Sequence, residues 1–173
     1  MPSSYQAPNR KSEGKAKTTS QSTDTNTSSD VATVQRVLDH KGGSVFSIRP
    51  QDTLGDAVKV LRDRRIGALL VTDANGSLQG ILSERDIVRK LAETPGQTLP
   101  QQVSDVMTTA VQTCTPDEPM VSVLRRMTEG RFRHMPIADG TGLVGMITIG
   151  DLVNYRLMEL EHEALQLKQL IVG

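Results

Sequence analysis

One short motif occurs twice in this chain, and this repetition constrains the fold more than any other feature. Segment 80–88 returns as segment 145–153: a glycine and two apolar residues precede a hydroxyl residue, and an aspartate follows the hydroxyl by three positions, giving Ser83 with Asp86 and Thr148 with Asp151. An internal repeat indicates similar units that bury their apolar faces against each other. The motif lies at a predicted strand-to-helix junction, so it also marks candidate functional positions.

The repeat extends upstream of this motif. Apolar residues at helical spacing recur 66 positions apart, as Leu54, Ala57, Val58 and Leu61 and then as Met120, Val123, Leu124 and Met127. They predict one amphipathic helix in each copy, with Asp52 and Asp117 as N-caps and Pro119 in the first turn. Each copy is predicted to have an opening turn, a strand, a helix, two strands joined by a tight turn and a closing helix. A unit of roughly 55–60 residues buries little surface alone, so we predict one intertwined module.

Composition excludes several classes of function. The formal net charge is zero and the chain has two Phe, two Tyr and no Trp, so neither a basic field nor stacking residues favour nucleic acid. The single cysteine, Cys114, excludes an internal disulfide framework, and its apolar context predicts a buried side chain. No apolar run reaches the roughly 20 residues that cross a bilayer. No metal-ligand spacing, nucleophile elbow or phosphate-binding glycine loop is found, so neither a metal site nor an enzyme is predicted.

The two ends of the chain differ from the repeats. Residues 1–33 are rich in Ser, Thr, Gln and Asn and predict a disordered polar tail. The tail is mildly basic like a transit peptide but lacks an apolar face, so a cytoplasmic protein is predicted. At the other end, apolar residues spaced 4, 3, 4, 3 and 4 apart form a coiled-coil seam: Val153, Leu157, Leu160, Ala164, Leu167 and Ile171. This helix either folds back on its own module or pairs with its twin in a homodimer, and we favour the homodimer.

The repeated segments resemble a known family. Segments 65–71, 80–86, 131–137 and 145–151, in this order, are similar to those of a stand-alone tandem cystathionine-β-synthase (CBS) domain pair, also called a Bateman module. The resemblance covers about residues 34–157. It implies an α/β fold with pseudo-twofold symmetry, small mixed sheets packed with helices, and a long C-terminal helix. The predicted division is a tail (1–33), CBS domain 1 (34–92), a linker (93–102), CBS domain 2 (103–157) and a helical extension (158–173).

The resemblance also implies a ligand. Such modules often bind AMP, ADP or ATP, in some members NAD or S-adenosylmethionine, in two clefts, and commonly regulate a partner protein. Asp86 and Asp151 would then hold ribose hydroxyls, with Ser83 and Thr148 beside them, because a carboxylate offers two acceptor oxygens to a diol. Cations for phosphate are expected from Arg85, Arg131, Arg133 and His134. The adenine would lie against Ile66, Gly67 and Ala68 in one copy and against Met135 and Pro136 in the other.

The sequence leaves three questions about the site open: the role of the repeated spacing, the equivalence of the two clefts and the role of Lys41. The hydroxyl-x-x-aspartate spacing also fits a helix cap, which needs no ligand. Arg85 corresponds to Gly150, so the two clefts are predicted to be unequal, and the Asp151 cleft must take a cation from elsewhere or bind a less charged group. Lys41 begins a three-residue length, Lys41-Gly42-Gly43, that only the first copy has and that could close over a ligand. The leading function is an adenine-nucleotide sensor, and the alternatives are a ligand-free dimerisation or adaptor domain or an S-adenosylmethionine sensor.

Overall fold

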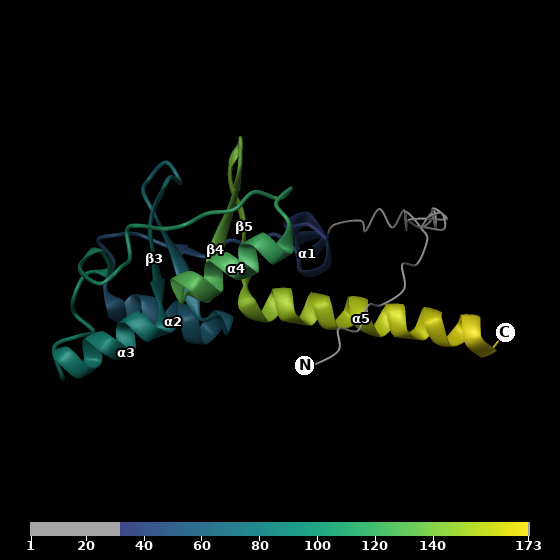
Figure 1. The fold of residues 1–173 in the computed structure, drawn as a ribbon. Helices are drawn as coiled ribbons and strands as arrows, with labels where there is room; N and C mark the ends of the chain where they lie inside the picture. Colours follow the sequence, from purple (N-terminus) through teal and green to yellow (C-terminus); the bar gives the residue numbers. More distant parts are fainter. Residues whose placement is uncertain (1–31, 173) are drawn as a thin grey trace, which may run out of the picture. The chain divides into compact units, whose positions relative to one another are not determined.

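The computed structural model describes residues 32–172 of the 173-residue chain, and these residues form an α/β fold (Figure 1). The elements in chain order are α1 (Val34–Lys41), β1 (Ser47–Ile48), α2 (Leu54–Arg64), β2 (Ala68–Thr72), β3 (Leu78–Ser83), α3 (Glu84–Glu93), a 3-10 turn η1 (Val103–Asp105), α4 (Met120–Gly130), β4 (His134–Asp139), β5 (Gly142–Thr148) and α5 (Ile149–Val172). The predicted small mixed sheets and long C-terminal helix are confirmed.

The two sheets follow the repeat. In the first copy β1 is parallel to β2, and β2 is antiparallel to β3. In the second copy β4 is antiparallel to β5, and the predicted opening strand is reduced to one parallel bridge between Cys114 and Ile137. Both strand-to-helix junctions close with the same backbone bond, from Glu84 N to Gly67 O at 3.0 Å and from Ile149 N to Arg133 O at 3.1 Å. The repeated sequence therefore produces a repeated backbone.

The two predicted amphipathic helices are present, but their N-caps differ from the prediction. Thr53 caps α2, and its side chain accepts a hydrogen bond from Asp56 N, whereas Asp52 accepts one from Arg49 N in the preceding turn. Pro119 occupies the N-cap of α4 instead of its first turn. Asp117 accepts a hydrogen bond from the Thr115 hydroxyl. Each helix thus begins two or three residues after the predicted aspartate cap, because these carboxylates hold the turn that leads into the helix.

The same face of each helix is buried, as the spacing predicted. Leu54, Ala57 and Leu61 in α2 are buried. Their counterparts in α4 are buried as well: Met120, Val123 and Met127. Both helices end in a left-handed arginine with φ of 54°, Arg65 after α2 and Arg131 after α4. The left-handed residue turns each chain sharply into the strand that follows its helix.

The opening segments of the two copies are exchanged. The segment before α1 bonds to the start of α4 in the second copy, through Val34 N to Glu118 O at 3.0 Å and Met120 N to Ala32 O at 3.0 Å. The corresponding segment of the second copy bonds to the first copy, through Val103 N to Asp52 O at 2.8 Å and Leu54 N to Gln101 O at 2.8 Å. Each copy is therefore completed by a segment of the other, which agrees with the predicted intertwined module.

The hydrophobic core follows this exchange. One cluster joins Val34, Val37 and Leu38 of α1 to the helix and strands of the second copy, and it includes Cys114, which is buried as predicted. Burial raises the pKa of the Cys114 thiol to about 12, so the thiol stays protonated at neutral pH. A second cluster joins Val103 to α2, β2 and β3, and a third joins Ala68 and Leu70 to Met146.

The remaining predictions on organisation concern the ends and the linker. The predicted tail lies outside the described residues except for its last two positions, and Thr33 forms a bridge with Pro119. The predicted linker is anchored at Thr98, which is buried and donates to Thr94 O at 2.7 Å. Within residues 32–172, no helix is long and apolar enough to cross a membrane, and no group of His, Cys, Asp or Glu could hold a metal ion.

Candidate functional site

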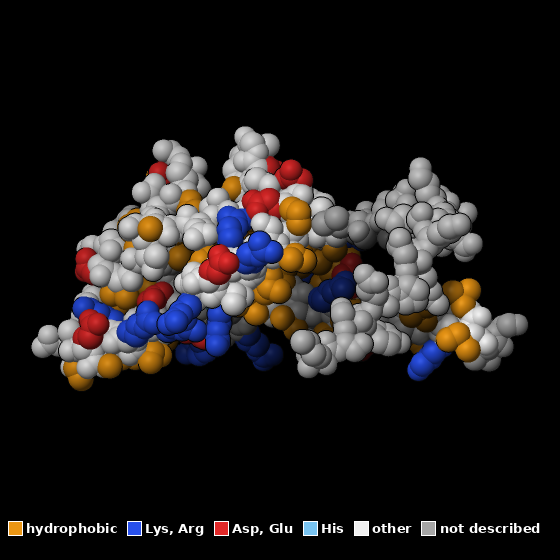
Figure 2. Space-filling view, viewed as in Figure 1, with side chains coloured by type: hydrophobic (Ala, Val, Ile, Leu, Met, Phe, Trp, Pro, Cys, Tyr) orange, Lys and Arg blue, Asp and Glu red, His pale blue; other side chains and the backbone are white. Residues whose placement is uncertain are grey.

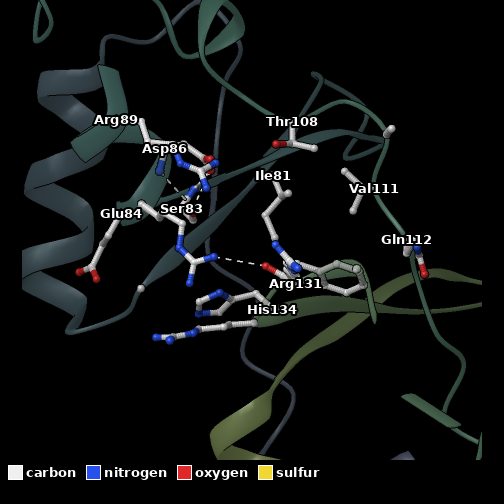
Figure 3. Close-up of a pocket in the computed structure, with 16 residues that line it drawn as sticks. Ile81, Ser83, Glu84, Asp86, Arg89, Thr108, Val111, Gln112, Arg131 and His134 are labelled. Carbon is white, nitrogen blue, oxygen red and sulfur yellow. Dashed lines mark hydrogen bonds between the residues drawn. The ribbon is translucent and has the colours of Figure 1, made fainter. Parts of the chain in front are cut away.

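A cleft with a cavity volume of about 520 Å³ opens beside the first hydroxyl–aspartate motif (Figure 3). It forms where the start of α3, the segment 108–112 and the segment 130–134 meet, so both copies contribute. We call it the first cleft. Its lining contains seven of the predicted site residues: Gly67, Ser83, Arg85, Asp86, Arg131, Arg133 and His134.

Asp86 in the first cleft serves as a helix cap with one of its two carboxylate oxygens. Its Oδ2 accepts hydrogen bonds from Ser83 N at 2.9 Å and from Ser83 Oγ at 2.6 Å, and Asp86 N donates to Ser83 Oγ at 3.4 Å. This is a reciprocal capping box. No donor among residues 32–172 bonds to Asp86 Oδ1. The cap that the spacing predicted is present, and it leaves the second oxygen able to accept from a ligand hydroxyl.

The lining of the first cleft carries more positive than negative charge. Four guanidinium groups face two carboxylates, namely Arg85, Arg89, Arg131 and Arg133 against Glu84 and Asp86. Arg85 Nη1 crosses from the first copy to donate to Arg131 O at 3.2 Å in the second. Arg131 is presented to the cleft by its left-handed backbone. A site with this charge suits an anion such as a phosphate group.

His134 lies between the two motifs. Burial lowers the pKa of His134, and the positive charges of Lys41, Arg133 and Arg85 lower it further, while the charge of Asp151 acts in the opposite direction. The imidazole is therefore neutral at pH 7. It packs closely on Gly67, where an added Cβ would come within 3.2 Å of His134 Nε2. A side chain at position 67 would therefore require the imidazole of His134 to shift by a few tenths of an ångström.

The second hydroxyl–aspartate motif has the same cap but a different neighbour. Asp151 Oδ2 accepts from Thr148 N at 2.9 Å, and Asp151 N donates to Thr148 Oγ1 at 3.1 Å. Lys41 Nζ forms an ion pair with the same Oδ2 at 2.5 Å and donates to Met146 O at 2.8 Å. The cation that this motif was predicted to take from elsewhere is therefore Lys41, and it bonds directly to the carboxylate.

Lys41 reaches Asp151 because the first copy is longer there and because the opening segments are exchanged. The prediction placed Lys41 in a loop that could close over a ligand, but Lys41 is the last residue of α1 and closes on Asp151. The first copy has ten positions from Leu38 to Ile48, whereas the second has seven from Met107 to Cys114. Of the three extra residues, Lys41 ends α1, Gly42 is its C-cap, and Gly43 lies in the loop that follows.

Of the adenine contacts predicted for the first copy, Ile66 and Ala68 do not line the first cleft, and those predicted for the second copy, Met135 and Pro136, are buried. Ala68, Met135 and Pro136 are buried, and Ile66 packs against the second core cluster. The strands are covered on both faces, so these side chains fill the core. The apolar lining comes from Ile81, Ala110, Val111 and Phe132 instead, and Thr108, Gln112 and Gly130 complete it. The sequence did not single out segment 108–112 because its exchange onto the first copy is a tertiary feature.

The comparisons with known proteins agree with this geometry. The family model for the CBS domain matches residues 37–93 and 103–157. The chain belongs to the CBS-domain family. A CBS domain-containing protein of Arabidopsis thaliana, CBSX3, mitochondrial, is 33% identical over 149 residues, which cover 82% of this chain and 72% of that protein. The predicted tandem CBS pair is thus confirmed, and CBS-domain proteins are generally regulatory and not catalytic.

Solved CBS structures support the same fold. The CBS-domain protein ATU1752 of Agrobacterium tumefaciens has a TM-score of 0.71 and 39% identity, covering 73% of this chain and 94% of that one. Two CBS structures contain ligands. CBSX2 was solved in complex with AMP (TM-score 0.57, 26% identity, 66% and 89% covered). The CBS domain pair of MJ0100 was solved with 5′-methylthioadenosine and S-adenosylmethionine (TM-score 0.64, 25% identity, 72% and 98% covered).

Proposed function

We propose that this CBS protein is a sensor whose first cleft binds an adenine nucleotide, AMP, ADP, ATP or NAD(H), and that occupancy of the cleft regulates a partner protein. The observation that carries the proposal is the Oδ1 oxygen of Asp86, which no described donor engages, in a cleft lined by four arginines. A carboxylate oxygen that the cap does not use can accept from a ribose hydroxyl. The AMP complex of CBSX2 supports this assignment.

Each part of a nucleotide has a counterpart in the first cleft. Asp86 and Ser83 would hold the ribose, and the arginines would neutralise the phosphates. Ile81, Val111 and Phe132 offer the apolar surface that a base needs. His134, whose pKa is lowered by burial, can donate or accept one hydrogen bond without adding charge. The first cleft thus combines a diol acceptor, cations and an apolar wall.

S-Adenosylmethionine is the second candidate ligand. The MJ0100 complex favours it, because that CBS pair binds S-adenosylmethionine and 5′-methylthioadenosine. The charge of the first cleft favours nucleotides, because a sulfonium cation would face four guanidinium groups. We therefore place the nucleotides first.

A ligand-free dimerisation or adaptor domain is the alternative of a different class. The caps support it, because they explain both copies of the repeated spacing within the chain without any ligand. The proposed sensor acts as a homodimer, and it lacks catalytic activity of its own. Its cytoplasmic location stays a prediction from the sequence.

Isothermal titration calorimetry with AMP, ATP, NADH and S-adenosylmethionine tests these candidates on one sample of folded protein. We expect a nucleotide to bind with one site per chain and S-adenosylmethionine to bind more weakly. Tighter binding of S-adenosylmethionine than of every nucleotide would select the second candidate. Folded protein that binds none of the four would leave the adaptor function. Native mass spectrometry of the same sample would also report any ligand retained through purification.

A further inference from the structure

The C-terminal half of α5 presents an apolar face that no described residue covers. Every described side chain from Leu160 to Ile171 is exposed, and Figure 1 shows this part of α5 extending past α1. Figure 2 shows apolar side chains at the surface near the end of this helix. The helix therefore does not fold back onto the module, which was one of the two outcomes that its sequence allowed. A helix face this apolar is typical of a helix with a partner.

The exposed residues have the heptad spacing of a coiled coil. Positions d are Val153, Leu160 and Leu167, and positions a are Leu157, Ala164 and Ile171. All six are exposed, and together they form one narrow stripe, which we call the α5 seam. Of the other exposed apolar residues of α5, Met158 and Leu165 lie away from the stripe, whereas Leu170 flanks it at position g. A stripe centred on a and d positions fits one partner helix better than a broad apolar surface does.

The charges beside the α5 seam fit a second copy of the same helix in parallel. In a parallel pair, a residue at position g faces the residue five positions later, at position e of the other helix. Arg156 would then face Glu161, and Glu163 would face Lys168, on both sides of the pair. Both of these flanking pairs join opposite charges. Within one chain Arg156 pairs with Glu159 at 3.2 Å on the exposed surface, a contact that contributes little stability.

An antiparallel pair would be less favourable. The antiparallel alignment with the longest overlap places Leu157 opposite Leu167 of the other copy. It also brings Glu161 beside the second Glu161 and Glu163 beside the second Glu163. Like charges at these positions repel each other. The charge pattern therefore selects the parallel alignment.

We infer that α5 pairs in parallel with α5 of a second copy of this chain, along the α5 seam. The pair forms whether or not a nucleotide is bound, because the seam begins at Val153 and runs away from the first cleft. The charge pattern is complementary to itself, so the occupant is this chain and not an unrelated helix. The two modules are joined at the same end of each helix, so they lie on the same side of the pair.

Two leucines of equal exposure provide a matched test of the α5 seam. Leu167 lies in the seam and is 60% exposed, whereas Leu165 lies outside it and is 58% exposed. The mass of the full-length protein is measured by light scattering after size exclusion. We expect the wild-type and Leu165→Glu proteins to have twice the mass of one chain, and the Leu167→Glu protein to have the mass of one chain. The circular dichroism spectra of the three proteins, recorded at equal concentration, should be the same. A monomeric wild-type protein, or equal masses for the two variants, would overturn the inference.

Disulfide cross-linking tests the direction of the helices. Leu167→Cys places two thiols opposite each other in the parallel pair, but opposite Leu157 in the antiparallel one. The native Cys114 is buried and does not interfere. We expect Leu167→Cys to form a covalent dimer under mild oxidation and Leu165→Cys not to. A dimer that cross-links equally through both positions, or through neither, would contradict the parallel arrangement.

Discussion

The two hydroxyl–aspartate motifs have the same cap but different surroundings. In the first, Asp86 keeps one oxygen that no described donor engages, at the edge of a cleft of about 520 Å³. In the second, the ammonium group of Lys41 lies on Asp151, 2.5 Å from Oδ2, and also holds Met146 O. The caps are a property of the repeat. No described donor engages Asp151 Oδ1 either, so the two motifs differ in the cation that Lys41 places on the capping oxygen Oδ2, and a duplicated motif need not give two equivalent sites.

The different surroundings of Asp86 and Asp151 also assign a role to the length of α1. The first copy is three residues longer between Leu38 and Ile48, and Lys41, the first of these extra residues, ends α1. In the second copy the shorter opening segment leaves Ala110 and Val111 at the wall of the first cleft. The first copy therefore places the cation of Lys41 beside Asp151 of the second copy, whereas the corresponding segment of the second copy offers no cation to Asp86. Four substitutions test this comparison, from the largest expected effect to the smallest.

The first substitution, Asp86→Ala, removes the acceptor in the open cleft. We expect nucleotide affinity to fall on the order of 10–100-fold, because hydrogen bonds to a charged group contribute about 1.5–3 kcal/mol each. Calorimetric titration measures the change. Asp151→Ala is the matched control: it removes the same kind of cap but should change the affinity of the first cleft by less than about 2-fold. Equal losses in the two variants would mean that both effects come from the caps.

The second substitution, Lys41→Met, removes the ammonium group from Asp151 Oδ2 while keeping the length of the side chain. We expect the number of nucleotides bound per chain to rise from one to two, because the carboxylate becomes available to a second ribose. Native mass spectrometry counts the bound nucleotides. Lys41→Arg keeps the positive charge and should leave the number at one. A count of one in Lys41→Met would show that the ion pair is not what closes the second motif.

The third substitution, Arg89→Met, removes one cation of the first cleft and leaves its cap intact. We expect about a 10-fold loss of affinity for ATP and no loss for adenosine, because a guanidinium acts on the phosphates. Arg125→Met is the control, since Arg125 is exposed on α4 and does not line the first cleft. A similar loss for adenosine and ATP would place Arg89 against the base or the sugar instead.

The smallest effect concerns His134, which lies between the motifs. Its pKa is lowered in the folded protein, mainly by burial, so the unfolded chain binds more protons below about pH 6.5. The free energy of unfolding should therefore fall as the pH decreases from about 7 to 5, and His134→Asn should weaken this fall. Urea denaturation at both pH values measures it, with exposed His40→Asn as the control. An unchanged pH dependence in His134→Asn would exclude His134 as the cause.

The sequence predicted the parts of the site that depend on local spacing. A hydroxyl three residues before an aspartate predicts the cap at Ser83 and Asp86, because both residues lie in the first turn of one helix. The repeat also predicted the buried faces of α2 and α4. The sequence also predicted that the two motifs would have unequal surroundings, since Arg85 in the first corresponds to Gly150 in the second.

The rest of the site depends on tertiary contacts that spacing does not report. Segment 108–112 forms one wall of the first cleft because the opening segment of the second copy packs on the first, and apolar periodicity does not say which copy receives it. Ala68 and Met135 were expected to face adenine, but strands covered on both faces bury them. The ion pair of Lys41 with Asp151 joins residues 110 positions apart, so no local pattern predicts it.

The exchanged opening segments also determine the order in which this chain can fold. Val34 donates to Glu118 O and packs in a core cluster that extends to Ile147 and Leu152, so α1 cannot be fully packed until most of the second repeat has been synthesised. Residues 44–93 likewise lack the segment around Val103 that covers their core. Contacts so distant along the chain slow folding and make it cooperative. Neither copy therefore has a complete core until segments of both copies are present.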